Sequence, residues 1–595
     1  MMRSACLALA LAFASAAFGG LLPQKSASVD LWTVSSGIKV MRDDPLPREP
    51  SRTVRLALAR NEYEAVQLVV RARKPVADVR VCVKADGLEA EVLRVGYVRV
   101  TVPTDEVGKA ADYPDPLPPQ EGRLPVAAGT NQPFWIRVRA PKDAVAGLHR
   151  GTVGVTVDGK TLEVPLEVEV FGFALPDTLT CQTAFGFEVE TVDRYHGLKT
   201  TEDRRTVWAK YLRELSRHHI SPYNPVPHAG WSVRWKGLEN PLTATPQFDF
   251  TEWDAAMEKA FSDYHFNTFQ IQLEGLGGGD WQSRWEPEYK GHKEGTPEYE
   301  ALMSKYLGGI ESHLKEKGWL DKGYVYWYDE PQEKDYGFVK NGFAKLKRWA
   351  PGLRRLLTDK PTKALLGGPN LWCPLTRTLH SEAEPEARKL KDRFWWYVCM
   401  DPKAPYATEF IDHPGLEMRL WLWQTWGEKV LGILMWNTTW WTSASAYPDA
   451  PQNPYRDPMG WEQADGLHEK KPWGNGDGRF FYPPPAAADG RPGSPVLDGP
   501  VVSYRMEMIR DGLEDYEYFV MLKRLLAKRT DLPAAESETL RALLAVPKSV
   551  SRSLTDFTTD PAPLEAHRIR LARAVERLLP VTQRNFANAV SVLLK

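Results

Sequence analysis

The stretch VGVTVDGKTLEVPLEVEV, residues 153–170, decides how the first third of the chain folds. Valine recurs at every second position up to Val157, and Leu or Val does so again from Leu162 onward. Asp158-Gly159 lies between these runs, and Asp-Gly flanked by alternating apolar residues is the strongest short-range signal of a tight β-hairpin. The stretch therefore predicts two antiparallel strands, each with one apolar face.

The same two-residue period continues on the N-terminal side of this hairpin. It recurs at Val54–Leu58 and at Phe134–Val138, and several such strands joined by turns predict an antiparallel β-sandwich over residues 25–176. The proline-rich stretch from Val102 to Pro125 interrupts the pattern. We expect it to be a long loop, because proline cannot donate to a central sheet ladder.

After Pro176 short β-rich runs alternate with helical patterns, which is typical of a parallel sheet covered by helices. We expect a (β/α)₈ TIM barrel over residues 177–500. A helical extension over residues 501–595 is expected to pack on it, so the fold class is multidomain β plus α/β. The eight candidate strands are Cys181–Phe187, Ile220–Asn224, Thr268–Leu273, Tyr324–Tyr328, Arg355–Thr358, Leu365–Trp372, Phe394–Cys399 and Leu431–Trp436.

Composition narrows the function classes. The 595 residues carry 76 Lys and Arg against 77 Asp and Glu, a formal charge of −1. This balance argues against a nucleic-acid partner, which would favour a basic surface. The 22 Trp equal the 22 Tyr, although Trp is usually the scarcest aromatic residue. Flat indole rings pack in large hydrophobic cores, and they also form surfaces on which sugar rings stack.

The first twenty residues have the pattern of a secretory signal peptide. Arg3 supplies a positive charge, and an apolar run from Cys6 to Phe18 precedes small residues suited to cleavage. The alternative is a membrane anchor, but the run is shorter than the roughly 20 residues that span a bilayer. We therefore expect residues 1–20 to be a signal peptide, the protein to be secreted or periplasmic, and no segment to span a membrane.

The cysteines and histidines give no support to a metal or cofactor. The cysteines after the leader include no CxxC pair, and four thiols in so long a chain do not form a disulfide framework. His218-His219 lacks the spacing of an HExxH zinc motif. We therefore expect neither a metal site nor a cofactor.

The motif YVYWYDEP at residues 324–331 is the sharpest candidate for chemistry. An aromatic strand ends there in Asp329 and Glu330, and the C-terminal ends of barrel strands face the active site. The alternative is a helix N-terminus, where acidic residues are also favoured. Other strand ends carry the rival carboxylates Glu188 and Glu274.

Adjacency limits what these two carboxylates can do. Glycosidases with two catalytic carboxylates hold them about 5 Å apart or more, on opposite sides of the sugar. Neighbouring residues instead serve one side of the bond, where like charge and burial keep one carboxyl protonated as a general acid. We hypothesise that Glu330 is this acid and that the substrate's own 2-acetamido oxygen is the nucleophile, with its N–H held by Asp329.

Aromatic residues and one amide at neighbouring strand ends are the candidates for sugar binding. Core packing is the alternative role for each of these tryptophans. The expected substrate-binding residues are Tyr328, Trp281 after the glycine loop at 275–279, Trp396 and Tyr397 on the seventh strand, and Trp436, Asn437 and Trp440 on and after the eighth.

An ordered series of motifs resembles the catalytic domain of glycoside hydrolase family 123 and the related domain of unknown function 4091. The loop 113–117 is also similar to one in that family's N-terminal sandwich. The series consists of Asp329-Glu330-Pro331, the run ending at Cys399, GILMWN at 432–437, GNGDG at 474–478, and the charged segment from Ser503 to Tyr516.

The resemblance implies a β-N-acetylgalactosaminidase that acts on glycan ends by substrate assistance. Asp329 would orient the acetamido group, Glu330 would be the acid/base, and Tyr397 would lie near the acetamido carbonyl. Two alternatives stay open. A glycosidase of other specificity could pair Glu330 with Glu188 or Glu274, and a non-catalytic protein could use the aromatic rim for carbohydrate binding alone.

Overall fold

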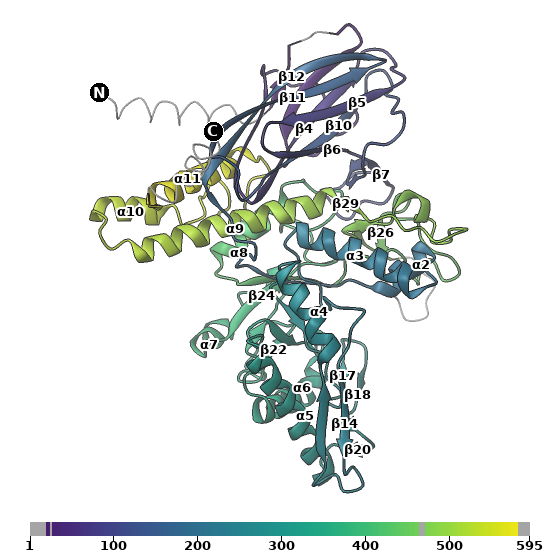
Figure 1. Ribbon diagram of the computed structural model, residues 1–595, viewed down its shortest axis with the longest axis vertical. Helices are drawn as coiled ribbons and strands as arrows, with labels where there is room; N and C mark the ends of the chain where they lie inside the picture. The colour runs from purple at the N-terminus through teal and green to yellow at the C-terminus, as the bar shows by residue number, and fades with distance from the viewer. Residues whose placement is uncertain (1–18, 24–25, 463–470, 581–595) are drawn as a thin grey trace, which may run out of the picture.

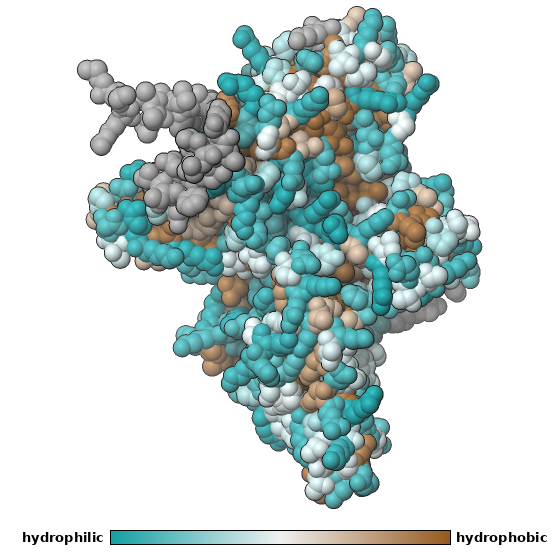
Figure 2. Space-filling view, viewed as in Figure 1, coloured by the Kyte–Doolittle hydropathy of each residue, from teal (hydrophilic) through white to brown (hydrophobic). Residues whose placement is uncertain are grey.

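A computed structural model describes residues 19–23, 26–462 and 471–580. Figure 1 shows three regions: β-sheets at one end, a layer of helices in the middle, and a helix-covered barrel at the other end. The predicted signal peptide lies almost wholly outside the described residues. Within them, no helix is both long and apolar enough to cross a membrane. The face in Figure 2 is mostly hydrophilic, with scattered apolar patches.

Two sheets form the predicted N-terminal sandwich and enclose a core of Val, Leu, Ile and Phe side chains from both. The first has the order β1 (Gly20–Leu21), β2 (Val29–Ser35), β4 (Glu62–Ala72), β10 (Asn131–Ala140) and β6 (Glu89–Arg94). The second has the order β3 (Val54–Arg60), β12 (Lys160–Ala174), β11 (Gly147–Val157) and β5 (Val79–Ala85).

The hairpin that the Asp-Gly pair predicts is present. Strands β11 and β12 pair antiparallel in register from Val157 opposite Lys160 to Gly147 opposite Val170. Asp158 and Gly159 both have positive φ, 45° and 82°, as a type I′ turn requires. The sandwich differs from the expectation in one pairing, since β3 runs parallel to β12.

The proline-rich stretch contains more structure than the predicted loop. Strand β8 (Ala111–Pro114) pairs with β7 (Tyr97–Val100), and β9 (Pro116–Leu117) pairs with β29 (Val501–Ser503) from the far end of the chain. These prolines lie in short edge ladders, where a missing N–H is tolerated. The segment therefore ties the sandwich to the C-terminal region.

The predicted barrel is present and nearly closed. Seven parallel strands have the order β13, β25, β24, β23, β22, β21, β16. Residues 221–223 fill the eighth position, where the Tyr223 N–H donates to Phe185 O and the Gln270 N–H to Tyr223 O, both at 2.9 Å. The strands are β13 (Gln182–Phe185), β16 (Phe269–Gln270), β21 (Gly323–Val325), β22 (Arg354–Leu357), β23 (Leu371–Trp372), β24 (Arg393–Tyr397) and β25 (Gly432–Met435).

Helices cover the outside of the barrel, and aromatic side chains fill its interior. The interior cluster includes Tyr324, Trp395 and Tyr397, so the barrel is a packed core and not a pore. No α-helix lies between β22 and β23, where a turn-rich connection replaces it. The helices are α2 (Val189–His196), α3 (Thr201–Arg217), α4 (Thr251–Ser262), α5 (Pro297–Glu316), α6 (Tyr336–Trp349), α7 (Glu384–Lys389) and α8 (Glu417–Gly427).

Helix α9 (Tyr504–Lys528) lies between the sandwich and the barrel (Figure 1). The Ser503 side chain caps its N-terminus by accepting a hydrogen bond from the Met506 N–H. Residues 504–520 are buried, charged side chains included. Two shorter helices follow, α10 (Ala534–Ala542) and α11 (Ala562–Leu578).

Buried ion pairs join these regions. Asp515 of α9 lies 2.7 Å from Arg419 Nε of α8 and 2.9 Å from Arg568 Nε of α11. The two arginines continue to the sandwich strand β4, where Arg568 reaches Glu62 at 2.5 Å and Arg419 reaches Glu64 at 3.2 Å. All five side chains are buried. Removing one partner would leave an uncompensated charge in a low-dielectric core.

We therefore expect Arg419→Met to destabilise the protein by about 3–5 kcal/mol, the usual cost of breaking a buried ion pair from one side. Chemical denaturation followed by far-UV circular dichroism measures this. The matched control is Arg552→Met, which removes a pair with Asp556 whose arginine side chain is 64% exposed. The control should lose less than about 1 kcal/mol. Equal losses in the two variants would contradict a special role for the buried cluster.

Candidate active site

The acid pair lies where the chain leaves strand β21. The Asp329 N–H donates to Gly279 O at 2.9 Å. Glu330 then adopts a left-handed backbone with φ of 42°, unusual for a residue with a side chain, and its N–H donates to Thr358 Oγ1 at 3.2 Å. The next helical turn begins at Glu333, so neither carboxylate caps a helix, in contrast to the alternative interpretation.

Two hydroxyl groups hold the Asp329 carboxylate. Its Oδ1 accepts hydrogen bonds from Tyr326 Oη at 2.6 Å and from Thr358 Oγ1 at 2.7 Å. Burial raises the pKa of Asp329 above its ordinary value, while these two hydrogen bonds oppose the rise. The donors favour the ionised form, which is the form that could accept a hydrogen bond from a ligand.

Glu330 has a different environment. Tyr397 Oη donates to Glu330 Oε1 across the barrel mouth. Burial, and then the charge of Asp329, raise the pKa of Glu330 to about 7, although the Tyr397 hydrogen bond lowers it. Two interacting carboxyl groups titrate as a pair. Both pKa values thus lie above their ordinary values, that of Glu330 at about 7, while two hydroxyl donors favour the ionised form of Asp329.

Strand β24 sends its two predicted site residues to opposite faces. Tyr397 belongs to the interior cluster and contacts Glu330. Trp396 is 0% exposed, donates to Thr425 Oγ1 at 3.0 Å and stacks on Trp421 of α8. This placement corrects the expectation that Trp396 contacts substrate, because successive strand residues point to opposite sides of a sheet.

Tyr328 is also away from the mouth. It is 1% exposed and packs against Trp327 and Phe338, each with ring centroids 5.8 Å away. Phe338 belongs to helix α6, so Tyr328 serves the layer between barrel and helix. The expectation that it binds substrate is corrected for this reason.

The predicted residues after β25 form a rim. Trp436 is half-buried and donates to Asp477 Oδ1 at 2.8 Å. Trp440 packs edge-on against Trp436 with centroids 5.0 Å apart and is 6% exposed. Asn437 is 1% exposed, and its amide donates to Glu188 Oε1 at 2.6 Å. Trp436 offers the more accessible indole of the two, while Asn437 is engaged within the protein.

The two rival carboxylates are placed differently from the acid pair. Glu188 is exposed and accepts hydrogen bonds from Asn437 and Thr191. Glu274 is 68% exposed and lies 3.8 Å from Lys290 Nζ. Trp281 is 40% exposed, and its carbonyl oxygen accepts a hydrogen bond from Gln332, two residues after Glu330. The structure therefore places Trp281 beside Gln332, which follows the acid pair in sequence.

Several residues of the site were missed from the sequence. Thr358 and Asp359 directly follow the neighbouring strand β22. Polar residues at the C-terminal end of a barrel strand could have indicated that these two belong to the site. Asp359 lies near Glu330, and burial raises its pKa to about 6. The aromatic sequence around Tyr326 predicts a strand and gives no sign that its hydroxyl group holds Asp329. Among the described residues, no group of three or more His, Cys, Asp or Glu side chains could hold a metal ion.

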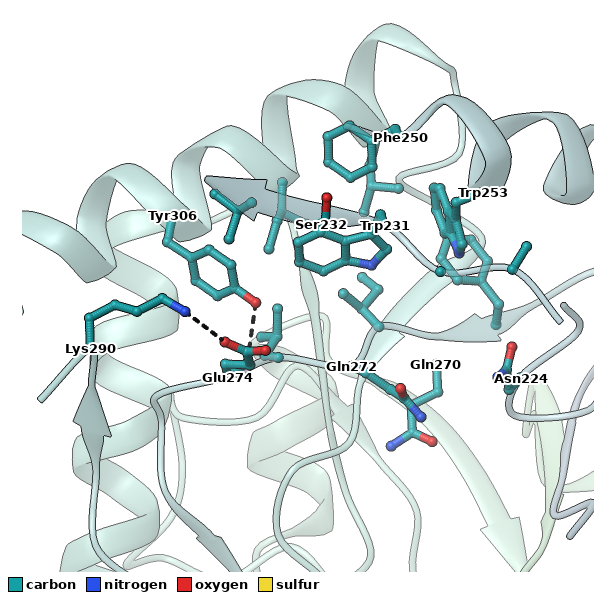
Figure 3. Close-up of a pocket in the computed structure, with 18 residues that line it drawn as sticks. Asn224, Trp231, Ser232, Phe250, Trp253, Gln270, Gln272, Glu274, Lys290 and Tyr306 are labelled. Carbon is teal, nitrogen blue, oxygen red and sulfur yellow. Dashed lines mark hydrogen bonds and ion pairs between the residues drawn. The ribbon is translucent and has the colours of Figure 1, made fainter. Parts of the chain in front are cut away.

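A cavity of about 530 Å³ lies beside the mouth (Figure 3). Its lining includes Trp231, Gln270, Gln272 and Glu274 but neither member of the acid pair. The acid pair, and not this cavity, offers the chemistry, because the pair combines two half-buried carboxyl groups with hydroxyl donors at strand ends. The cavity is a separate feature of the same barrel face.

Comparison with known proteins places this geometry in a family. Residues 247–522 match the model of the glycoside hydrolase 123 catalytic domain, a span that includes both members of the acid pair. No curated protein matches the chain significantly. A family 123 glycoside hydrolase from Clostridium perfringens, described in terms of glycolipid glycan hydrolysis, is similar with a TM-score of 0.59 and 15% identity. The similarity covers 96% of this chain and 100% of that chain.

Other solved structures are similar over less of their length. A β-glucuronidase from Parabacteroides merdae has a TM-score of 0.24 at 11% identity, over 64% of this chain and 46% of that one. A glycosyl hydrolase family 2 member from Bacteroides cellulosilyticus has a TM-score of 0.22 at 10% identity, over 64% and 44%. The similarity to the Clostridium enzyme shows a shared fold. Residues 247–522 match the glycoside hydrolase 123 catalytic domain, in agreement with the predicted motif series.

Proposed function

We propose that the protein is an exported, exo-acting glycoside hydrolase that releases terminal β-linked N-acetylgalactosamine from glycans with retention of configuration. The observation that carries the proposal is the acid pair itself: two adjacent carboxyl groups, of which Glu330 has a pKa raised to about 7 and Asp329 accepts hydrogen bonds from two hydroxyl groups. The glycolipid glycan described for the Clostridium relative supports a glycan as substrate.

The proposed mechanism uses the substrate's acetamido group as nucleophile. Glu330 donates its proton to the glycosidic oxygen while that bond to C1 breaks. The acetamido carbonyl oxygen forms the new bond to C1, and Asp329 accepts a hydrogen bond from the acetamido N–H. In the second half, ionised Glu330 takes a proton from water, and the water oxygen attacks C1. The bond between C1 and the acetamido oxygen breaks, so the acetamido group is restored.

The surroundings of the acid pair support this mechanism over the alternative with a second carboxylate. Glu188 is occupied by Asn437, and Glu274 is highly exposed beside Lys290. A nucleophile in a two-carboxylate mechanism comes from across the sugar ring. The residue that contacts Glu330 from the opposite side of the mouth is Tyr397, which carries a hydroxyl group and no carboxylate.

We expect Glu330→Gln to lower kcat/KM on an unactivated β-N-acetylgalactosaminide by about 10²–10⁴-fold, because general acid catalysis contributes that much. With a p-nitrophenyl leaving group, which departs with little protonation, the loss should be smaller. Asp329→Asn should lower both rates. Glu333→Gln, an exposed carboxylate three residues further on, is the control and should retain activity. Loss of activity in Glu188→Gln but not in Asp329→Asn would favour the alternative mechanism.

The pH profile should report the acid pair. Glu330 must be protonated to act as acid, so kcat/KM on the unactivated substrate should fall as pH rises through about 7. Asp329→Asn removes a negative charge, which lowers the pKa of Glu330 and moves this limb to lower pH. Tyr397→Phe removes a hydrogen bond to the ionised form and moves it to higher pH. Shifts in the same direction would contradict the assignment.

Stability offers a test that needs no turnover. Folding raises the pKa of Glu330 from about 4.5 to about 7, so the wild type loses stability as pH rises through this window. Glu330→Gln cannot ionise and should be more stable than the wild type at pH 8, by up to about 3 kcal/mol. At about pH 4 the difference should vanish. Urea unfolding at both pH values measures it, and Glu333→Gln should show no such dependence.

A further inference from the structure

The cavity beside the mouth is enclosed by elements that belong to the barrel's second and third units. Its walls are residues 229–233, the start of α4, one side of α5, and residues 269–274. Residues 232 and 233 begin β14 (Ser232–Lys236), which pairs with β15 (Thr245–Asp249). Its volume of about 530 Å³ lies in the range of small-molecule sites.

An aromatic wall lines one side of the cavity. The Trp231 ring lies in the middle of Figure 3, between Phe250 and Tyr306. The ring centroids are 5.4 Å apart for Trp231 and Phe250 and 5.9 Å apart for Trp231 and Tyr306. Trp231 is half-buried, so these neighbours hold its ring while part of it stays accessible. A fixed and accessible indole is a surface on which the C–H face of a pyranose can stack.

Amide groups lie opposite this wall. In Figure 3, Gln270, Gln272 and Asn224 lie below the Trp231 ring. The Gln272 amide is exposed and makes no hydrogen bond to any residue that the structure describes. An amide both donates and accepts, so Gln272 can bond a sugar hydroxyl in either sense. An aromatic wall facing such amides suits a polyhydroxylated ring.

Charge narrows the ligand class. The charged side chains of the lining are Glu274 and Lys290, which lie 3.8 Å apart at one end of the cavity (Figure 3). Because they offset one another, the lining presents no net charge to a ligand. A phosphate, a sulfate or an acidic sugar would need unpaired cations there. The lining therefore favours a neutral sugar.

Hydrogen bonds connect this cavity to the acid pair. Gln270 Nε2 donates to Tyr326 O at 2.9 Å, and the Tyr326 hydroxyl donates to Asp329. The strands concerned, β16 and β21, are neighbours in the barrel. The cavity therefore lies one strand away from the chemistry, at the same C-terminal ends, and a glycan held at the acid pair could extend into it.

We propose that this cavity is a subsite for a neutral pyranose on the leaving-group side of the scissile bond, with Trp231 as stacking platform and Gln272 as hydroxyl partner. The subsite rests on the proposed function, since it assumes that the terminal sugar occupies the acid pair. It makes the enzyme selective for oligosaccharides over simple glycosides.

Two substrates with the same terminal sugar test the subsite. One is p-nitrophenyl β-N-acetylgalactosaminide and the other is N-acetylgalactosamine β-linked to lactose. Trp231→Ala should lower kcat/KM on the lactose conjugate by about tenfold, as expected for loss of one aromatic anchor, and leave the aryl substrate within about twofold. Gln272→Ala, at an exposed position that folding tolerates, should act in the same direction. Leu238→Ala, 37% exposed in the β14–β15 turn, is the matched control for both substrates.

Equal losses of kcat/KM on the two substrates would overturn the subsite. An octyl β-N-acetylgalactosaminide gives a third comparison: if only its hydrolysis is impaired, the cavity binds an alkyl chain and the subsite is also overturned. If the wild type hydrolyses neither substrate, the proposed function fails, and a binding measurement then tests the subsite on its own. Lactose titrated into the Glu330→Gln protein and followed by NMR should then bind at millimolar concentration. Binding that Trp231→Ala abolishes supports the subsite, and absence of binding overturns it.

Discussion

The constraint on which the site depends is the placement of two adjacent, half-buried carboxyl groups at one strand end. In a medium of low dielectric, two neighbouring carboxylates cannot both ionise without a large cost. The protein divides the roles by unequal hydrogen bonding, since Asp329 accepts from two hydroxyl groups and Glu330 from one. The donors are Tyr326 just after β21, Thr358 just after β22 and Tyr397 at the end of β24, so barrel closure assembles them. The left-handed backbone of Glu330 is held by Thr358, which also bonds Asp329.

The sandwich contributes to the mouth through buried charges. Arg505 of α9 pairs with Asp115 of the proline-rich segment at 2.9 Å and donates to Gly476 O at 2.8 Å. The next residue, Asp477, accepts the Trp436 indole N–H. One arginine thus links the sandwich, the GNGDG loop and the rim tryptophan. The charged segment that begins at Ser503 therefore braces the mouth, which explains why so polar a helix is buried.

The sequence predicted what has a strong local signal. The Asp-Gly turn lies where its pattern indicated, and seven of the eight candidate ranges overlap a barrel strand. The range Ile220–Asn224 contributes only an isolated bridge, and Leu365–Trp372 is a strand only over Leu371–Trp372. The side to which a barrel residue points was not predictable, because strands of a parallel barrel are apolar on both faces and lose the two-residue period. Trp396 and Tyr397 illustrate this, since both read as apolar neighbours. Trp231 was missed because only its contacts with Phe250 and Tyr306, distant in sequence, make it a wall.

A nucleophile supplied by the substrate would free the other strand ends from carrying a second carboxylate. The end of β16 is consistent with that freedom, since it carries the amides Gln270 and Gln272. Amides suit hydroxyl recognition, as they both donate and accept and need no counter-charge when partly buried. Under the proposed mechanism, the barrel therefore places chemistry on β21 and recognition on its neighbour β16, and Tyr326 lies between the two. The Tyr326 backbone carbonyl accepts a hydrogen bond from Gln270, and the Tyr326 hydroxyl donates one to Asp329. Tyr326 would therefore help to position both Gln270, beside the leaving sugar, and Asp329, which binds the acetamido N–H.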